Sequence, residues 1–128
     1  MDIRKTLALL ALACAAGLAS AAEPKVFTQQ AFDKIAQEGR PVVVDVAATW
    51  CPTCKAQKPI IEGLSRQPAY QDVAVLTVDF DSDKHVVKAF KVGMQSTLIA
   101  FRGGKEVGRS VGDTTPAGIE GLFKKAVN

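Results

Sequence analysis

One stretch of the sequence decides the fold, because it joins an apolar run to a pair of cysteines. It reads Pro41-Val42-Val43-Val44-Asp45-Val46-Ala47-Ala48-Thr49-Trp50-Cys51-Pro52-Thr53-Cys54-Lys55. Residues 41–47 are β-branched or apolar at nearly every position, which predicts a central strand buried on both faces. From Cys51 onward the apolar residues are spaced as on a helix. The sequence therefore places Cys51 and Cys54 where a buried strand gives way to a helix.

Helices and buried strands alternate along the rest of the chain. The spacing predicts helices over 28–36, 51–66, 83–90 and 115–127, and strands over 41–47, 73–79, 97–101 and 106–111. Asp83 is the predicted N-cap of the third helix, and Gly103-Gly104 make the turn of a hairpin between the last two strands. This order predicts an α/β fold, with a central mixed sheet of four to five strands and helices on both faces.

The first 22 residues follow the pattern of a secretory signal peptide. Arg4 and Lys5 give a positive start, residues 6–19 are apolar or small, and small residues occupy 20–22. A run of about 14 apolar residues is too short to span a bilayer comfortably, although an uncleaved anchor stays an alternative. We expect a signal peptide over 1–22, one domain over 23–128, and a periplasmic or secreted protein.

Cys14 leaves a second alternative open, because a cysteine near the end of such a peptide can carry a lipid. Ala13 suits a lipidation site, but a leucine is usual where Ala11 stands. We favour a cysteine inside a cleaved peptide, which leaves Cys51 and Cys54 as the two cysteines of the mature protein.

Charge excludes one class of partner. The net charge is +3, and basic and acidic residues are interleaved without a basic block. Nucleic acid is therefore not an expected partner. We expect the domain to act as a monomer.

The two cysteines are spaced for redox chemistry. A helix N-terminus favours a thiolate, so we expect Cys51 to be exposed, with a lowered pKa, and to act as a nucleophile. Cys54 lies one turn on, slightly buried, where it can attack a mixed disulfide formed by Cys51. The loop they close is too short to stabilise the fold much. A structural zinc ion needs about four ligands, and His85 is the only histidine, so no metal or cofactor is expected.

From Phe27 to Val127 the chain resembles the thioredoxin family. The strand, the Trp-Cys-x-x-Cys-Lys segment and the following helix are specific to that family. Asp45, six residues before the first cysteine, matches a buried acid, and Pro59, five residues after the second, matches a proline that kinks the helix. Gly104 and Gly112 fall near the family's glycines in and after the last hairpin.

The resemblance implies a thioredoxin fold and dithiol–disulfide exchange with protein partners. Cys51 would be the nucleophile and Cys54 the resolving thiol, while a buried Asp45 with a raised pKa would assist proton transfer at Cys54. Trp50 would form an apolar wall beside the sulfurs. The residues expected to meet a substrate are Trp50, Pro52, Thr53, Gln95, Ser96 and Thr97.

The sequence departs from the family at Ser96, which stands where thioredoxins have a cis-proline. A cis bond before a non-proline residue costs about 2.5–4 kcal/mol, so we expect a trans Gln95–Ser96 bond and a rearranged loop. In the family this loop offers a backbone edge to substrate peptides and shields the cysteines from metals. A periplasmic Cu(I)-binding protein, with both thiolates on the metal, is therefore the alternative function.

The dipeptide between the cysteines also differs from the common family members. Pro52-Thr53 is neither the Gly-Pro of reducing thioredoxins nor the Pro-His of strongly oxidising periplasmic enzymes. Thr53 brings no positive charge to stabilise a thiolate, which favours a reductant. Thr77 stands near the position of a family lysine close to the buried acid. We therefore predict an exported reductase of protein disulfides that takes electrons from a membrane partner, because NADPH-linked reductases are cytosolic.

Overall fold

The centre of the molecule is a five-stranded mixed sheet, and the computed structural model describes residues 23–128. The strands lie in the order β1–β3–β2–β4–β5, with β1 and β3 parallel to β2 and the hairpin of β4 and β5 antiparallel to it. Their bounds are β1 Lys25–Val26, β2 Pro41–Ala47, β3 Ala74–Asp79, β4 Thr97–Arg102 and β5 Lys105–Val111. The expected signal peptide and Cys14 lie outside the described residues.

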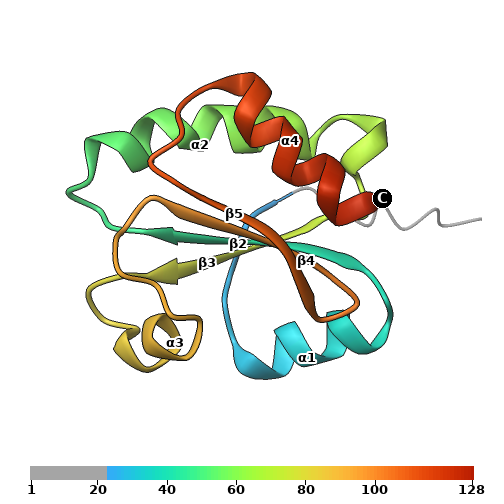
Figure 1. Cartoon of the computed structure of the whole chain (residues 1–128), viewed down its shortest axis with the longest axis horizontal. Helices are drawn as coiled ribbons and strands as arrows, with labels where there is room; N and C mark the ends of the chain where they lie inside the picture. Colours follow the sequence, from blue (N-terminus) through green and yellow to red (C-terminus); the bar gives the residue numbers. More distant parts are fainter. Residues whose placement is uncertain (1–22) are drawn as a thin grey trace, which may run out of the picture.

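Four α-helices cover the two faces of this sheet. They are α1 Gln29–Gln37, α2 Pro52–Ser65, α3 Lys84–Ala89 and α4 Pro116–Val127, with a short 3₁₀ helix, η1, at Pro68–Tyr70. The helices α1 and α3 lie on one face, while α2 and α4 lie on the other (Figure 1). The predicted α/β fold, with a mixed sheet between two helical layers, is confirmed.

Side chains of β2 alternate between two hydrophobic cores. Val43 packs with Ile61 and Phe123 under α2 and α4. Val42, Val44 and Val46 face the other way, into a cluster with Phe32 under α1 and α3. These valines are fully buried, so the prediction of a central strand covered on both faces is confirmed.

The register of the strands brings the ends of β2 and β3 and the start of β4 together at one edge of the sheet. Val46 pairs with Thr97 across β2 and β4, and Ala47 pairs with Asp79 across β2 and β3. The loops that follow β2 and β3 and the loop that precedes β4 therefore meet at this edge (Figure 1). The cysteine pair lies there.

Two short elements escaped the sequence analysis. Strand β1 has two exposed residues and η1 has three residues, so neither shows a periodic pattern that sequence inspection detects. The other boundaries lie within two residues of the prediction. In residues 23–128 no helix combines the length and the apolar character that crossing a membrane requires.

Candidate active site

Cys51 and Cys54 form a disulfide at the start of α2. Cys51 is the N-cap of the helix, and its Sγ accepts a hydrogen bond of 3.1 Å from the Cys54 backbone N–H. Pro52 occupies the first turn, where its missing N–H leaves no hydrogen bond unmade. The same N–H and the positive end of the helix would face a thiolate at position 51 after reduction.

The prediction that Cys51 is exposed is wrong for the disulfide-bonded form. Cys51 is 1% exposed and Cys54 is 8% exposed, so the first cysteine is the more deeply buried. The N-cap turn folds its sulfur back over the helix, and both cysteines pack with Ala48 and Phe80. Phe80, which the sequence analysis missed, thus forms one wall of the redox centre.

Asp45 is the ionisable group built into the sheet next to this centre. Burial raises the pKa of its carboxyl to about 6, and its Oδ1 has no hydrogen-bond partner among the described residues. On the neighbouring strand Thr77 lies directly opposite, so no cation faces the carboxylate from that register position. The pKa of Asp45 is thus raised as predicted, while the residue as a whole is half-buried and its part in proton transfer stays a prediction.

A cleft of about 650 Å³ connects Asp45 with the redox pair. Its lining includes Asp45, Cys54, Ala47 and Thr77, but not Cys51. A carboxyl group with a pKa of about 6 populates both its protonated and its charged form near that pH. When such a group shares a cleft with a thiol, it can accept the thiol's proton and later return it. The geometry therefore links the acid to Cys54.

Trp50 is held at the surface by an acid that the sequence analysis missed. Its side chain is 56% exposed, and its Nε1–H donates to Asp81 Oδ2 at 2.6 Å. The turn after β3 places Asp81, since Asp79 Oδ1 accepts from the backbone N–H groups of residues 81 and 82. These bonds also lower the pKa of Asp79. The sequence signal that could have identified Asp81 is its position, two residues after the end of a predicted strand.

The loop before β4 has the trans geometry expected at Ser96. No peptide bond in residues 23–128 is cis, and Ser96 instead adopts a φ of +59° in the left-handed region. Thr97 is buried, and its hydroxyl donates to the Met94 carbonyl at 2.7 Å. Ser96 and Thr97 are both buried, while Met94 and the half-buried Gln95 reach the surface, so a substrate contact at positions 96 and 97 stays a prediction.

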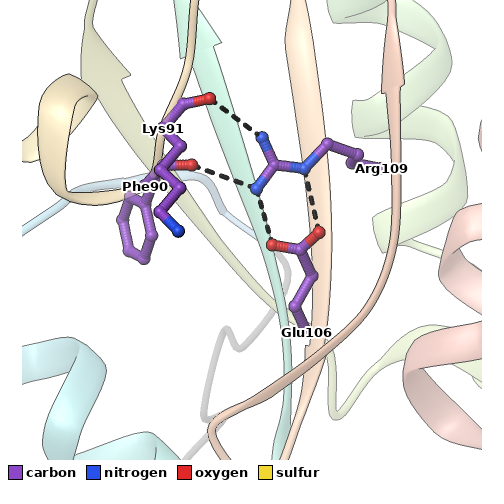
Figure 2. A network of polar contacts seen from close by, with 4 residues as sticks. All are labelled: Phe90, Lys91, Glu106 and Arg109. Carbon is purple, nitrogen blue, oxygen red and sulfur yellow. Dashed lines mark hydrogen bonds and ion pairs between the residues drawn. The ribbon is translucent and has the colours of Figure 1, made fainter.

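The chain that leads into this loop is anchored by Arg109 of β5 (Figure 2). Its guanidinium donates to the carbonyls of Phe90 and Lys91 at 3.0 and 3.3 Å, just after α3. A bidentate pair with Glu106 holds the guanidinium in place and lowers the pKa of that carboxyl. Lys91 has a φ of +55°, so Arg109 stabilises a left-handed residue at the end of the helix.

Asp83, the predicted N-cap of α3, occupies that position but uses its side chain differently. The structure shows no capping bond from it, and its Oδ2 accepts from the Asp79 N–H instead. Across residues 23–128, no cluster of three or more His, Cys, Asp or Glu side chains is placed to hold a metal ion.

Comparison with known proteins agrees with this geometry. The model of the family described as Thioredoxin matches residues 23–125. The protein named Thioredoxin Asp f 29 of Aspergillus fumigatus is 33% identical over 104 residues, which cover 80% of this chain and 94% of that protein. Thioredoxin-1 of Saccharomyces cerevisiae is 40% identical over 93 residues, which cover 73% and 87%.

Solved structures show the same arrangement of helices and strands. The crystal structure of Trxlp from Edwardsiella tarda matches with a TM-score of 0.77 at 40% identity, covering 79% of this chain and 98% of that one. A mutant thioredoxin from Halobacterium salinarum matches with a TM-score of 0.75 at 29% identity, covering 88% and 97%.

Proposed function

Because the chain belongs to the thioredoxin family and is a thiol–disulfide oxidoreductase of that type, we propose that it reduces disulfides in exported proteins through Cys51 and Cys54. The observation that carries this proposal is the placement of the pair. One sulfur caps the helix next to a backbone N–H, and the other shares a cleft with a buried carboxyl group of raised pKa.

The proposed reaction transfers two electrons in two exchanges. The Cys51 thiolate attacks one sulfur of a substrate disulfide, which forms a mixed disulfide and releases the first substrate thiolate. Asp45 then accepts the proton of Cys54, whose thiolate attacks Cys51 Sγ and releases the second substrate thiolate. The protein ends with the Cys51–Cys54 disulfide and the substrate with two thiols. One released thiolate takes the proton held by Asp45, and the other takes a proton from solvent, which balances the proton that Cys51 lost on ionising.

The burial of Cys51 makes the assignment of the nucleophile testable. In the disulfide form Cys54 lines the cleft and Cys51 does not, so exposure alone favours the second sulfur. We expect reduced protein, treated with limiting iodoacetamide at pH 6.5, to be alkylated first at Cys51, because only that sulfur faces the helix N-terminus. Peptide mapping identifies the alkylated residue. Faster alkylation of Cys54 would reverse the two roles.

A reducing role is supported by the residues between the cysteines. Pro52 and Thr53 carry no positive charge that would stabilise the reduced form and make the disulfide strongly oxidising. We expect an equilibrium potential near the thioredoxin value of about −270 mV, measured against a glutathione buffer series. A potential near about −120 mV, that of the strongest periplasmic oxidants, would assign the opposite direction of electron flow.

Export is supported by the charge and apolar pattern of residues 1–22. An exported reductase lies outside the reach of cytosolic NADPH-linked enzymes, so its electrons would come from a membrane partner. Expression of the full chain in a Gram-negative host, followed by fractionation and mass spectrometry, tests this. The expected product is a periplasmic chain that begins at Glu23, and a full-length chain in the cytoplasm would contradict it. Light scattering of the same product tests the proposed monomer.

Turnover decides between the reductase and the copper alternative. We expect the protein to reduce insulin with dithiothreitol as the electron source, and Cys51→Ser to abolish that turnover. Absence of wild-type turnover, combined with stoichiometric Cu(I) binding lost in the same variant, would support the metal-handling function instead.

A further inference from the structure

Gln57 is a buried polar residue that the redox mechanism leaves unexplained. It lies on α2 three residues after Cys54, on the side of the helix that faces the sheet edge, and is 1% exposed. Its Oε1 has no hydrogen-bond partner among the described residues. A buried and unpaired amide oxygen destabilises a protein, and an apolar side chain of similar length would avoid that effect. Packing alone therefore does not account for a glutamine here.

The amide NH₂ group explains why a glutamine is present at position 57. Nε2 donates to the Ser96 carbonyl at 3.2 Å and to the Asp113 carbonyl at 2.9 Å. Both acceptors are carbonyl oxygens, so the NH₂ group, and not Oε1, must face them. One side chain thereby joins three segments: the helix that carries Cys54, the loop before β4 and the loop after β5.

Ser96 needs such a contact because its backbone is in an unfavourable conformation. A φ of +59° is uncommon for a residue with a Cβ, and surrounding contacts must maintain it. Its carbonyl accepts from Gln57 and also from the Gly112 N–H at 3.0 Å. Within residues 23–128, its own hydroxyl donates only to the neighbouring Gln95 carbonyl. The contacts from Gln57 and Gly112 therefore fix the direction of the Ser96 peptide group.

We propose that Gln57 is a positioning residue for the substrate: it sets the backbone at Gln95–Ser96 against the redox pair. The inference rests on the proposed function and on docking of the protein partner along this loop, which the family resemblance implies. Because Gln57 lies one helical turn from Cys54, the loop moves with the helix that carries the sulfurs. A peptide bound along the loop is thus held at a fixed position relative to the cysteine pair.

The test is Gln57→Met, which keeps the length of the side chain and removes both donors. We expect KM for insulin to rise about tenfold with kcat nearly unchanged, as the loss of a positioning hydrogen bond predicts. Reduction of the Cys51–Cys54 disulfide by dithiothreitol, which needs no peptide docking, should change less than about twofold. Ser65→Ala is the matched control, because it removes another buried α2 hydrogen bond, to the Ile61 carbonyl, far from the loop.

Hydrogen exchange at Gly112 gives a second readout that does not depend on turnover. Its N–H should be protected in the wild type and in Ser65→Ala, and should exchange at least about tenfold faster in Gln57→Met. An unchanged KM in Gln57→Met, or an unprotected wild-type Gly112 N–H, would overturn the inference. Failure of the wild type to reduce insulin would overturn the proposed function instead, and the exchange data would still report on the contact.

Discussion

Replacing Asp45 by Asn should stabilise the protein at neutral and alkaline pH. The carboxyl group is buried in β2 beside the redox pair, with one oxygen unpaired, and burial raises its pKa from 3.8 to about 6. A raised pKa in the folded state means that folding favours the protonated acid. Above pH 6 the folded protein must hold a buried charge that the unfolded chain exposes to water, which lowers the free energy of unfolding.

The magnitude follows from the two pKa values. Each tenfold difference in proton affinity corresponds to about 1.4 kcal/mol, so the gap between 3.8 and about 6 amounts to about 3 kcal/mol at pH 8. The destabilisation declines as pH falls through the folded-state pKa, to about 1.6 kcal/mol at pH 5, and nearly vanishes below pH 4. Asn removes the charge with almost no change in shape, so the free energy of unfolding of the variant should rise by these amounts.

Urea denaturation at pH 8 and pH 5, followed by the fluorescence of the single tryptophan, measures the effect. Both proteins are kept in the disulfide form, so that cysteine ionisation does not contribute. Asp72→Asn, at an exposed position, is the matched control and should show no such gain. A destabilised Asp45→Asn, or a gain that is equal at the two pH values, would refute the assignment of a buried charge. The variant should also reduce insulin more slowly, because Cys54 loses its proton acceptor.

Three further predictions concern the surroundings of the redox pair and the core under α2 and α4. Asp81→Ala removes the partner of Trp50 and should lower kcat/KM for insulin about fivefold while shifting the tryptophan emission to the red; unchanged emission would contradict this role. Arg109→Met releases the carbonyls of Phe90 and Lys91 and should speed amide exchange over residues 90–96 about tenfold, with little change in Tm because the arginine is exposed. Phe123→Ala should lower the free energy of unfolding by about 3–5 kcal/mol in urea titrations, since the ring is fully buried against Tyr70; a smaller loss would mean that the core collapses into the cavity.

The sequence by itself determined the fold class and the chemistry. Local rules act over a few residues, so the apolar run of 41–47 predicts a buried strand and Thr115-Pro116 predicts a helix start, as the structure confirms. The spacing of Cys51 and Cys54 at a helix start likewise predicts their pairing chemistry. The raised pKa of Asp45 is what the resemblance to the thioredoxin family implied for an acid at this position.

Tertiary structure alone decided how the redox pair is surrounded. The burial of Cys51 depends on Phe80, which follows a different strand, and Trp50 finds its acid 31 residues away at Asp81. The reach of Gln57 to the Ser96 carbonyl spans 39 residues. None of these contacts leaves a periodic trace along the chain, because each arises only when strand register brings separate loops to one edge of the sheet.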